Sequence, residues 1–264
     1  MLDIDKLTCG YGSKVVLRDI SFNVNSGEII GIVGPNGSGK TTMLRAITAI
    51  INPVSGTIRI DGKDTSKTSI REMARRVAVV SQGVEDSYMT VEEFVLMGRI
   101  PYYGRLQFFE TSRDEELAAK YMEMSGISKL KDHALKEISG GERQLAMIAR
   151  ALCQETKLIL LDEPTAHLDI SHQSAILDLI RELKKEHGIT VVMVLHDLNL
   201  ASEYCDRLVL INNGRVHSAG EPGEVLSYKN IEEVYKTVVV VKENPVSKKP
   251  HVFVVSKDSI KNEF

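Results

Sequence analysis

One stretch decides how this chain folds: Gly34-Pro35-Asn36-Gly37-Ser38-Gly39-Lys40-Thr41. It satisfies the pattern G-x-x-x-x-G-K-[S/T] and follows the apolar run Glu28–Val33, which has the length of a buried parallel strand. Leu44, Ile47 and Ile51 come next with helical spacing, and Pro53 is expected to end that helix. Glycines in such a turn let backbone N–H groups surround an anion, and the helix N-terminus adds its positive dipole end. The segment therefore predicts a phosphate-binding loop in an α/β protein.

The last residues of this loop have side chains suited to a nucleotide and its metal ion. Lys40 is long enough to reach the β- and γ-phosphates, and the Thr41 hydroxyl is suited to Mg²⁺. An ordinary glycine-rich turn is the alternative interpretation. The complete match between a strand and a helix disfavours that alternative.

A second apolar strand ends in two carboxylates. Leu158–Leu161 is followed by Asp162 and Glu163. Ligands of open α/β sheets bind at the carboxyl ends of the strands, so Asp162 fits the acid that holds Mg²⁺ in phosphoryl transfer. Glu163 would lie beside it, placed to polarise a water molecule. Taken alone, the two acids could equally form a turn or a helix cap.

The composition excludes several classes of protein. The chain has 264 residues, 33 Lys and Arg against 36 Asp and Glu, and 43% hydrophobic residues. This near balance of charge disfavours a polybasic nucleic-acid binder, and the length suffices for a core without disulfides. Cys9, Cys153 and Cys205 form no C-x-x-C pair and are expected to be buried thiols.

No segment has the length and hydrophobicity of a membrane span. The longest apolar runs, such as Val191–Leu195 and Val238–Val241, are far shorter than the roughly 20 residues that a span needs. The N-terminal residues 1–6 carry acids where a signal peptide needs basic residues. The chain is therefore expected to be cytoplasmic.

The order of strand and helix patterns predicts a parallel sheet with helices on its faces. Hairpin turns are expected at Asp61-Gly62 and Asn212-Asn213-Gly214. Helix formers interrupted by glycines fill residues 91–97, 113–125 and 142–153. Strands resume at 158–161 and 190–195, around a helix at 171–187 that Gly188 is expected to end.

A third motif narrows the function. Ile138-Ser139-Gly140-Gly141-Glu142-Arg143-Gln144 resembles the signature of ABC-type ATPases, usually written LSGGQ. Ile138 replaces Leu and Glu142 replaces Gln, but the Ser-Gly-Gly core is intact. Ser139 and Glu142 also form a capping-box pattern, so a simple helix start is the alternative interpretation. Both interpretations are compatible, because a glycine-opened helix N-terminus is a good phosphate clamp.

The resemblance to ABC ATPases covers nearly the whole chain and implies its architecture. The expected fold is an α/β P-loop NTPase with a mixed or parallel core sheet, an N-terminal antiparallel β subdomain and an inserted α-helical subdomain. The ATPase domain would span residues 1–237. Its catalytic lobe would comprise residues 1–82 and 156–237, its helical subdomain residues 83–155, and a β-hairpin tail residues 238–264.

The resemblance also implies site residues and the ligands ATP and Mg²⁺. In this family the aromatic residue matched by Tyr11 stacks on adenine, and those matched by Glu163, His196 and Lys40 act in catalysis. The ATP-binding loop comprises Gly34, Pro35, Asn36, Gly37, Ser38, Gly39, Lys40, Thr41 and Thr42. Mg²⁺ would be held by Thr41, Gln82 and Asp162. Ser139, Gly140, Gly141 and Glu142 would contact ATP bound to a second copy, with Asp169 in the loop that crosses to it. His167 and His172 have no metal-ligand spacing and are interpreted as structural.

Finer similarity points to one group of transporters. Glu163–Ile170, His196–Ala201 and Gly98–Tyr102 look like segments of ATPase subunits that energise importers of iron–siderophore complexes, haem or cobalamin. The resemblance implies a homodimer of ATPase subunits on two membrane-spanning permease subunits, and indirectly a substrate-binding protein. It would place the chain on the inner face of the cell membrane, without nucleic acid as a partner.

Two other classes of protein remain as alternatives. A soluble ABC ATPase of iron–sulfur cluster assembly has a similar length and would not transport anything. A P-loop kinase or GTPase needs neither Ser139-Gly140-Gly141 nor His196 in this order and is disfavoured. Co-purification with a polytopic membrane protein would separate a transporter subunit from a soluble factor.

Overall fold

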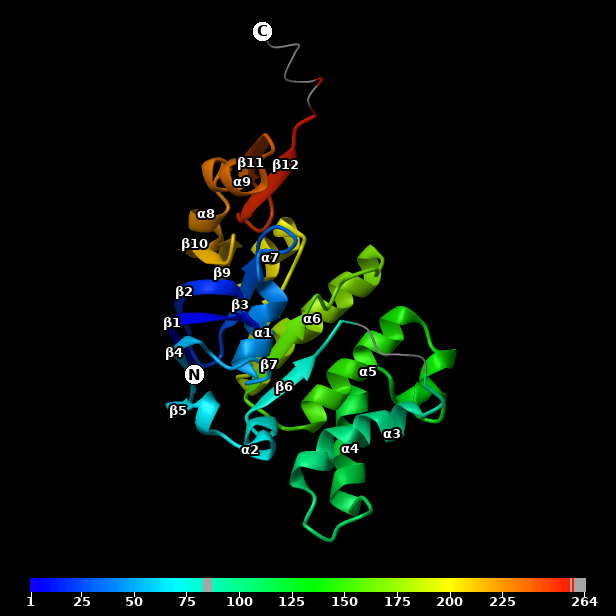
Figure 1. Cartoon of the computed structure of the whole chain (residues 1–264). Helices are drawn as coiled ribbons and strands as arrows, with labels where there is room; N and C mark the ends of the chain where they lie inside the picture. Colours follow the sequence, from blue (N-terminus) through cyan, green and yellow to red (C-terminus); the bar gives the residue numbers. More distant parts are fainter. Residues whose placement is uncertain (83–86, 257, 259–264) are drawn as a thin grey trace. The chain divides into compact units, whose positions relative to one another are not determined.

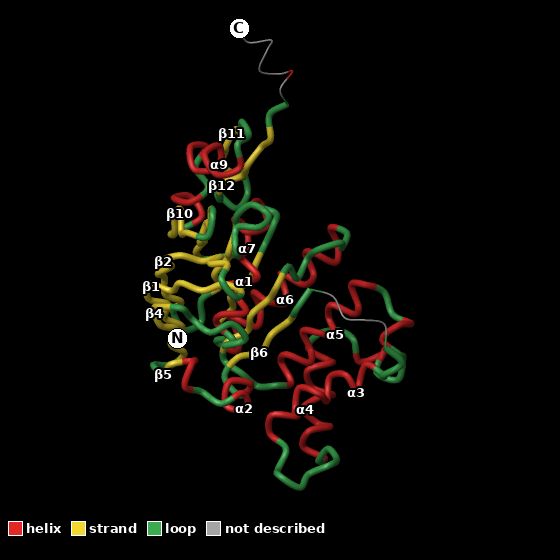
Figure 2. The backbone as a smooth tube through the Cα atoms, in the orientation of Figure 1, coloured by secondary structure: helices red, strands yellow, loops and turns green. Residues whose placement is uncertain are grey.

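A computed structural model describes residues 1–82, 87–256 and 258 of the chain (Figure 1). The chain forms two compact units, one made of residues 1–66 and 192–264 and the other of residues 67–191. Each unit contains both strands and helices (Figure 2). The α/β class expected from the sequence is therefore correct.

The first unit begins with an antiparallel sheet in the order β2-β1-β4-β5. Its strands are β1 (Leu2–Tyr11), β2 (Lys14–Val24), β4 (Ser55–Ile60) and β5 (Lys63–Asp64). The predicted hairpin is confirmed: Asp61 and Gly62 have φ of 50° and 77°, as a tight hairpin turn requires. β1 had not been predicted, although it buries Leu2, Ile4 and Leu7 on one face.

A second group of paired strands in the first unit contains the strand that leads into the phosphate-binding loop. β3 (Ile29–Val33) pairs in parallel with β9 (Arg207–Asn212), with Ile32 opposite Val209. β9 continues through Asn213-Gly214 into the antiparallel strand β10 (Arg215–Gly220), which confirms the second hairpin. All of β3 is buried, as expected for a continuous apolar run.

The helices of the first unit are α1 (Lys40–Ile47), α7 (Leu198–Tyr204), α8 (Pro222–Val225) and α9 (Tyr228–Tyr235). The predicted end of α1 was wrong. The helix ends before Thr48, and Ala49 has a φ of 57°, so the chain has left the helix before Pro53. Ile51 lies in the loop that follows α1, and its side chain is buried from there. Its distance along the sequence from Leu44 and Ile47 matches helical periodicity only by coincidence.

The last strands of the chain form a hairpin of their own. β11 (Val239–Glu243) and β12 (Pro250–Val254) pair antiparallel, with Val241 opposite Val252. The tail was predicted over residues 238–264, of which 257 and 259–264 lie outside the described residues.

The second unit contains a parallel strand pair and a long helix. β6 (Val77–Val80) pairs with β7 (Leu158–Asp162), and α6 (Ile170–His187) ends at Gly188, whose φ of 62° confirms the predicted helix stop. β8 (Thr190–Val194) runs from this unit into the first. A short helix, α2 (Ile70–Ala74), precedes β6.

Helices dominate the remainder of the second unit. They are α3 (Val91–Leu96), α4 (Ser112–Met124) and α5 (Gly140–Cys153), joined by 3₁₀ turns at Met97–Tyr102, Ser128–Leu130 and Leu135–Glu137. All three predicted helices are confirmed to within two residues. The boundaries 83–155 of a separate helical subdomain stay a prediction, and residues 83–86 lie outside the described part.

A buried cluster of ion pairs around Arg99 stabilises this helical region. Arg99 is 5% exposed and donates from Nε to Asp114 and from Nη1 to Glu155, both at 2.9 Å. Burial by itself would raise the pKa of Asp114, but hydrogen bonds from Thr111 and Arg99 outweigh it and lower that pKa.

Within Gly98–Tyr102, Ile100 is the residue whose side chain is available to a partner. It is 53% exposed, whereas Arg99 is buried.

The substitution Asp114→Asn is expected to lower the free energy of unfolding by about 2–4 kcal/mol, because it leaves the buried Arg99 with a single carboxylate. Chemical denaturation measures the change. Asp3→Asn is the matched control: its pair with Arg59 is exposed and 3.9 Å long, so the loss should stay below about 1 kcal/mol. Because the pKa of Asp114 is lowered, its contribution persists at neutral pH and disappears only as the pH falls through that pKa. Equal losses in the two variants would contradict the assignment of Arg99 and Asp114 as a stabilising pair.

Candidate active site

The phosphate-binding loop leaves no room for side chains at two of its glycines. Gly39 precedes α1 with a φ of 108°, and a Cβ there would lie 2.5 Å from Cδ2 of Leu17. A Cβ on Gly34 would lie 2.1 Å from the carbonyl oxygen of Ile211 in β9. The loop is therefore packed against the strands around it, and only glycine fits these positions.

Hydrogen bonds fix the shape of the loop. The N–H of Ser38 donates to Pro35, and the N–H of Gly214 donates to Ser38, each at 3.2 Å. Lys40 is 6% exposed, and its Nζ donates to the carbonyl oxygens of Gly34 at 2.8 Å and Pro35 at 3.0 Å. The ammonium group of Lys40 is thus held against the loop, at the place where it is expected to contact the phosphates.

Ser38 lies within the loop, and Tyr235 of α9 lies next to it. Within the described residues, the buried Oγ of Ser38 has no hydrogen-bond partner. Buried hydroxyls are almost always hydrogen-bonded, so this orphan fits a ligand oxygen such as that of a phosphate. The hydroxyl of Tyr235, at the end of α9, is hydrogen-bonded with the backbone of Gly34. Burial raises the pKa of Tyr235 to about 12, although this hydrogen bond acts in the opposite direction.

The first unit also positions Tyr11 and His196. Tyr11 lies at the end of β1, is 45% exposed, and its hydroxyl accepts a hydrogen bond from Nη1 of Arg45 at 2.9 Å. This leaves part of its ring accessible for stacking. His196 is exposed in the short connection between β8 and α7.

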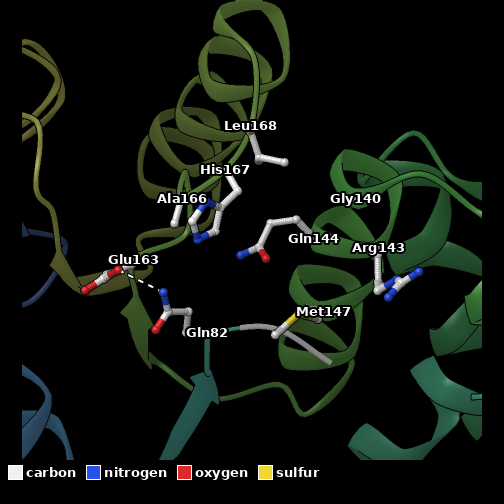
Figure 3. Close-up of a pocket in the computed structure, with 9 residues that line it drawn as sticks. All are labelled: Gln82, Gly140, Arg143, Gln144, Met147, Glu163, Ala166, His167 and Leu168. Carbon is white, nitrogen blue, oxygen red and sulfur yellow. Dashed lines mark hydrogen bonds between the residues drawn. The ribbon is translucent and has the colours of Figure 1, made fainter. Parts of the chain in front are cut away.

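The second unit brings Gln82 and Glu163 together. Gln82 follows β6, Glu163 follows β7, and Nε2 of Gln82 donates to Oε2 of Glu163 at 3.1 Å (Figure 3). Asp162, the last residue of β7, is half-buried next to them. Glu163 and His167 have φ of 54° and 62°. Non-glycine residues rarely adopt this left-handed conformation, so the turn after β7 is set by its surroundings and not by residue type.

A pocket of about 420 Å³ lies next to Glu163 within the second unit (Figure 3). It is lined by Gln82, Gly140, Arg143, Gln144, Met147, Glu163, Ala166, His167 and Leu168. The position of His167 and Gln144 beside Glu163 was not predicted from the sequence. The positive φ of His167 has no signal in the sequence, because histidine does not require a left-handed backbone.

The signature segment forms the N-terminus of α5. The Oγ of Ser139 accepts from the N–H of Glu142 at 3.3 Å, and Oε2 of Glu142 accepts from the N–H of Ser139 at 2.8 Å. The predicted capping box is therefore confirmed. Hydrogen bonding of the Ser139 side chain and backbone to the Glu142 carboxylate lowers the pKa of Glu142. A Cβ on Gly141 would lie 2.2 Å from Cδ2 of His172, so this position also excludes a side chain.

Asp169 caps the next helix and orients His172. Its carboxylate accepts from the backbone N–H of His172 at 2.9 Å and from the hydroxyl of Ser171 at 2.7 Å. Nδ1 of His172 lies 2.9 Å from both carboxylate oxygens. Hydrogen bonds from the His172 backbone and from Ser171 hold the pKa of Asp169 well below its usual range.

The donor atoms fit Mg²⁺ by their chemistry. Mg²⁺ binds oxygen atoms and is held in phosphoryl-transfer sites by one or two protein side chains together with substrate phosphates. Gln82 and Asp162 of the second unit carry oxygens of this kind, and so, considered by itself, does Thr41 of the first unit. Within the described residues, no group of three or more His, Cys, Asp or Glu side chains forms a metal site of another kind.

Comparison with known proteins identifies the family. Residues 17–166 match the family description for ABC transporters. The chain belongs to the ABC transporter family. Its cassette is therefore that of an ATPase, as the signature segment predicted.

Individual relatives are similar over most of the chain. The ferric enterobactin transport ATP-binding protein FepC of Escherichia coli strain K12 is 37% identical over 249 residues, which cover 94% of this chain and 92% of FepC. The cobalamin import ATP-binding protein BtuD of Halobacterium salinarum strain R1 is 38% identical over 247 residues, or 93% of this chain and 61% of BtuD.

Solved structures confirm the cassette fold. A structure described as an inward-facing conformation of a metal-chelate type ABC transporter has a TM-score of 0.85 and 27% identity, covering 98% of both chains. The dimeric bacterial ABC transporter cassette MJ0796 has a TM-score of 0.74 and 28% identity, covering 84% of this chain and 99% of that one. Among the described residues of the present chain, no helix has the length and hydrophobicity to cross a membrane.

Replacement of Ser139 by Ala is expected to lower the free energy of unfolding by about 1 kcal/mol, because α5 loses its N-cap. Thermal unfolding of the nucleotide-free protein measures the loss. Ser139→Thr keeps a capping hydroxyl and should retain most of the stability. A Ser139→Ala variant as stable as the wild type would show that the capping box does not support this helix.

Proposed function

We propose that this chain is the ATP-hydrolysing subunit of an importer of metal chelates, in the class of iron–siderophore complexes, haem and cobalamin. The observation that carries the proposal is similarity over 93–94% of the chain to ATP-binding subunits whose names specify ferric enterobactin and cobalamin. The alternative of a soluble ATPase in iron–sulfur cluster assembly is not favoured by these relatives.

The proposed assembly contains two copies of this chain on two membrane-spanning permease subunits, at the inner face of the membrane. A substrate-binding protein would deliver the chelate to the permease. The dimeric cassette MJ0796 supports pairing of two ATPase subunits. The exposed Ile100 and the aromatic residues Phe108 and Phe109, about 80% exposed, offer apolar contacts to a permease.

We assign the binding of the ATP phosphates to Gly34–Thr42 and the stacking on adenine to Tyr11. The orphaned Oγ of Ser38 and the buried ammonium of Lys40 support this role, because both polar groups are held at the loop. When Mg²⁺ is bound, it neutralises phosphate charge. Thr41, Gln82 and Asp162 are the proposed ligands.

Glu163 is the proposed group that orients or deprotonates the attacking water, with His196 contacting the γ-phosphate. The hydrogen bond from Nε2 of Gln82 to Oε2 of Glu163 supports this assignment, because it holds the carboxylate in place. In the dimer, Ser139–Glu142 of one copy would contact ATP bound to the other. Asp169 would help to join the copies. The capping box fixes the N-terminus of α5, whose positive dipole end favours a γ-phosphate.

Glu163→Gln is expected to reduce kcat for ATP hydrolysis by at least about 100-fold while the Kd for ATP stays within threefold. The amide keeps the size of the side chain and a hydrogen-bond acceptor for Gln82 but cannot take up a proton. Steady-state hydrolysis and equilibrium ATP binding measure the two quantities. The variant should also accumulate an ATP-bound dimer, detectable by size-exclusion chromatography. Near-wild-type turnover would remove Glu163 from this role.

The transport assignment is tested by purification from membranes. The tagged chain, expressed from its native genomic context and extracted in mild detergent, should co-purify with a polytopic membrane protein in equal amounts. Reconstituted vesicles with that permease should take up a ferric siderophore or cobalamin only with ATP, and the Glu163→Gln chain is the matched control. Recovery of the chain with iron–sulfur assembly factors, without a membrane protein, would favour the alternative.

A further inference from the structure

The C-terminal hairpin β11–β12 has no role in the site described so far. It belongs to the first unit and packs on α7, the helix that directly follows His196. Any displacement of α7 therefore moves the backbone next to this histidine. The contacts between the hairpin and α7 decide how firmly that helix is held.

The central contact is a paired hydrogen bond from Asn199. Its Nδ2 donates to the carbonyl oxygen of Val252 at 3.2 Å, and its Oδ1 accepts from the N–H of the same residue at 2.7 Å. The side-chain amide thus satisfies both backbone groups of Val252, as a neighbouring strand would. Val252 itself is 8% exposed, so loss of this amide would leave buried backbone groups unpaired.

Two further hydrogen bonds join the middle and the end of α7 to the hairpin. The hydroxyl of Ser202, which is 1% exposed, donates to the carbonyl oxygen of Pro250 at 2.7 Å. Nζ of Lys249 donates to the carbonyl oxygen of Glu203 at 2.7 Å, close to the C-terminus of the helix, where a cation complements the dipole. The hairpin therefore holds α7 at its beginning, its middle and its end.

Asn199 is also joined to His196 through a rigid turn. The carboxylate of Asp197 caps α7 by accepting from the N–H of Asn199 at 2.7 Å and from the N–H of Leu200 at 3.0 Å. The backbone of Asn199 is thus fixed by the residue after His196, and its side chain is fixed by β12. One peptide bond, from His196 to Asp197, connects this hydrogen-bonded cap to the histidine.

The C-terminal segment also reaches the phosphate-binding loop. The N–H of Val239 in β11 donates to Oε1 of Glu232 in α9 at 3.2 Å. The same helix ends at Tyr235, whose hydroxyl is hydrogen-bonded with the backbone of Gly34. The hairpin is therefore hydrogen-bonded to α9, the helix that carries Tyr235.

From these contacts we infer that Asn199 is a positioning residue for His196 and that the hairpin β11–β12 is its support. The inference rests on the proposed role of His196 in ATP hydrolysis. Without the hairpin contact, α7 tilts more freely and His196 spends less time within reach of the γ-phosphate. ATP binding by the phosphate loop does not depend on this contact.

The test compares Asn199→Ala with Val246→Ala, a substitution at the exposed turn of the same hairpin, where the side chain is 88% exposed. Asn199→Ala should lower kcat for ATP hydrolysis about tenfold, with KM and the Kd for ATP within twofold of the wild type. Val246→Ala should change none of these values. Ser202→Ala is the second variant should Asn199→Ala fail to fold, and it should lower kcat in the same way.

The NMR signal of the His196 imidazole reports on its position and would not be changed by general destabilisation. In the two-dimensional NMR spectrum of the imidazole C–H groups, the His196 signal is assigned by its loss in His196→Gln. Asn199→Ala should shift or broaden this signal and leave that of His217, in β10, unchanged. An unchanged His196 signal overturns the inference, whether kcat falls or not, and so does an unchanged kcat.

Failure of the proposed function gives a different result. If the wild type hydrolyses no ATP, or if His196→Gln keeps wild-type kcat, the assigned role of His196 fails. The response of the His196 signal to Asn199→Ala still reports whether the hairpin positions the histidine.

Discussion

The turn between β3 and α1 imposes the constraint on which the first unit depends. Its backbone must approach Ile211 and Leu17 so closely that Gly34 and Gly39 have no space for a Cβ. Such an approach requires β9 and the chain around Leu17 to be in place, and the N–H of Gly214 in the β9–β10 turn completes the contact. The geometry of the phosphate-binding loop is therefore a property of the strands around it as much as of its own glycines.

Helix caps recur at or next to the residues to which ATP contacts or dimer contacts are assigned. Ser139, Asp169 and Asp197 each accept hydrogen bonds from the first turn of a helix, at α5, α6 and α7. Each cap fixes the direction of the chain where it enters the helix and satisfies N–H groups that would otherwise lack partners. The same residues thus contribute to stability and set the orientation of their neighbours, which makes substitutions at these positions affect both properties.

Strain marks the segment around Glu163. Glu163 and His167 both adopt left-handed backbone conformations, which cost of order 1–3 kcal/mol each. At the same place Glu163 accepts the hydrogen bond from Gln82, and residues of α5 line the adjoining pocket. A relaxed turn at this place would point the carboxylate elsewhere.

The sequence alone determined the α/β class, the phosphate-binding loop, the capping box at Ser139, two hairpins and the stop of α6 at Gly188. Each of these follows from local chemistry: a glycine that tolerates positive φ, a side chain that caps its own helix, or a run of apolar residues. Tertiary structure decided the rest. It ended α1 before Pro53, buried Arg99 between two carboxylates, brought His167 and Gln144 to the pocket beside Glu163, and joined Asn199 to Val252. These contacts link residues far apart in the chain or depend on backbone angles that the residue type does not require, so no local pattern could reveal them.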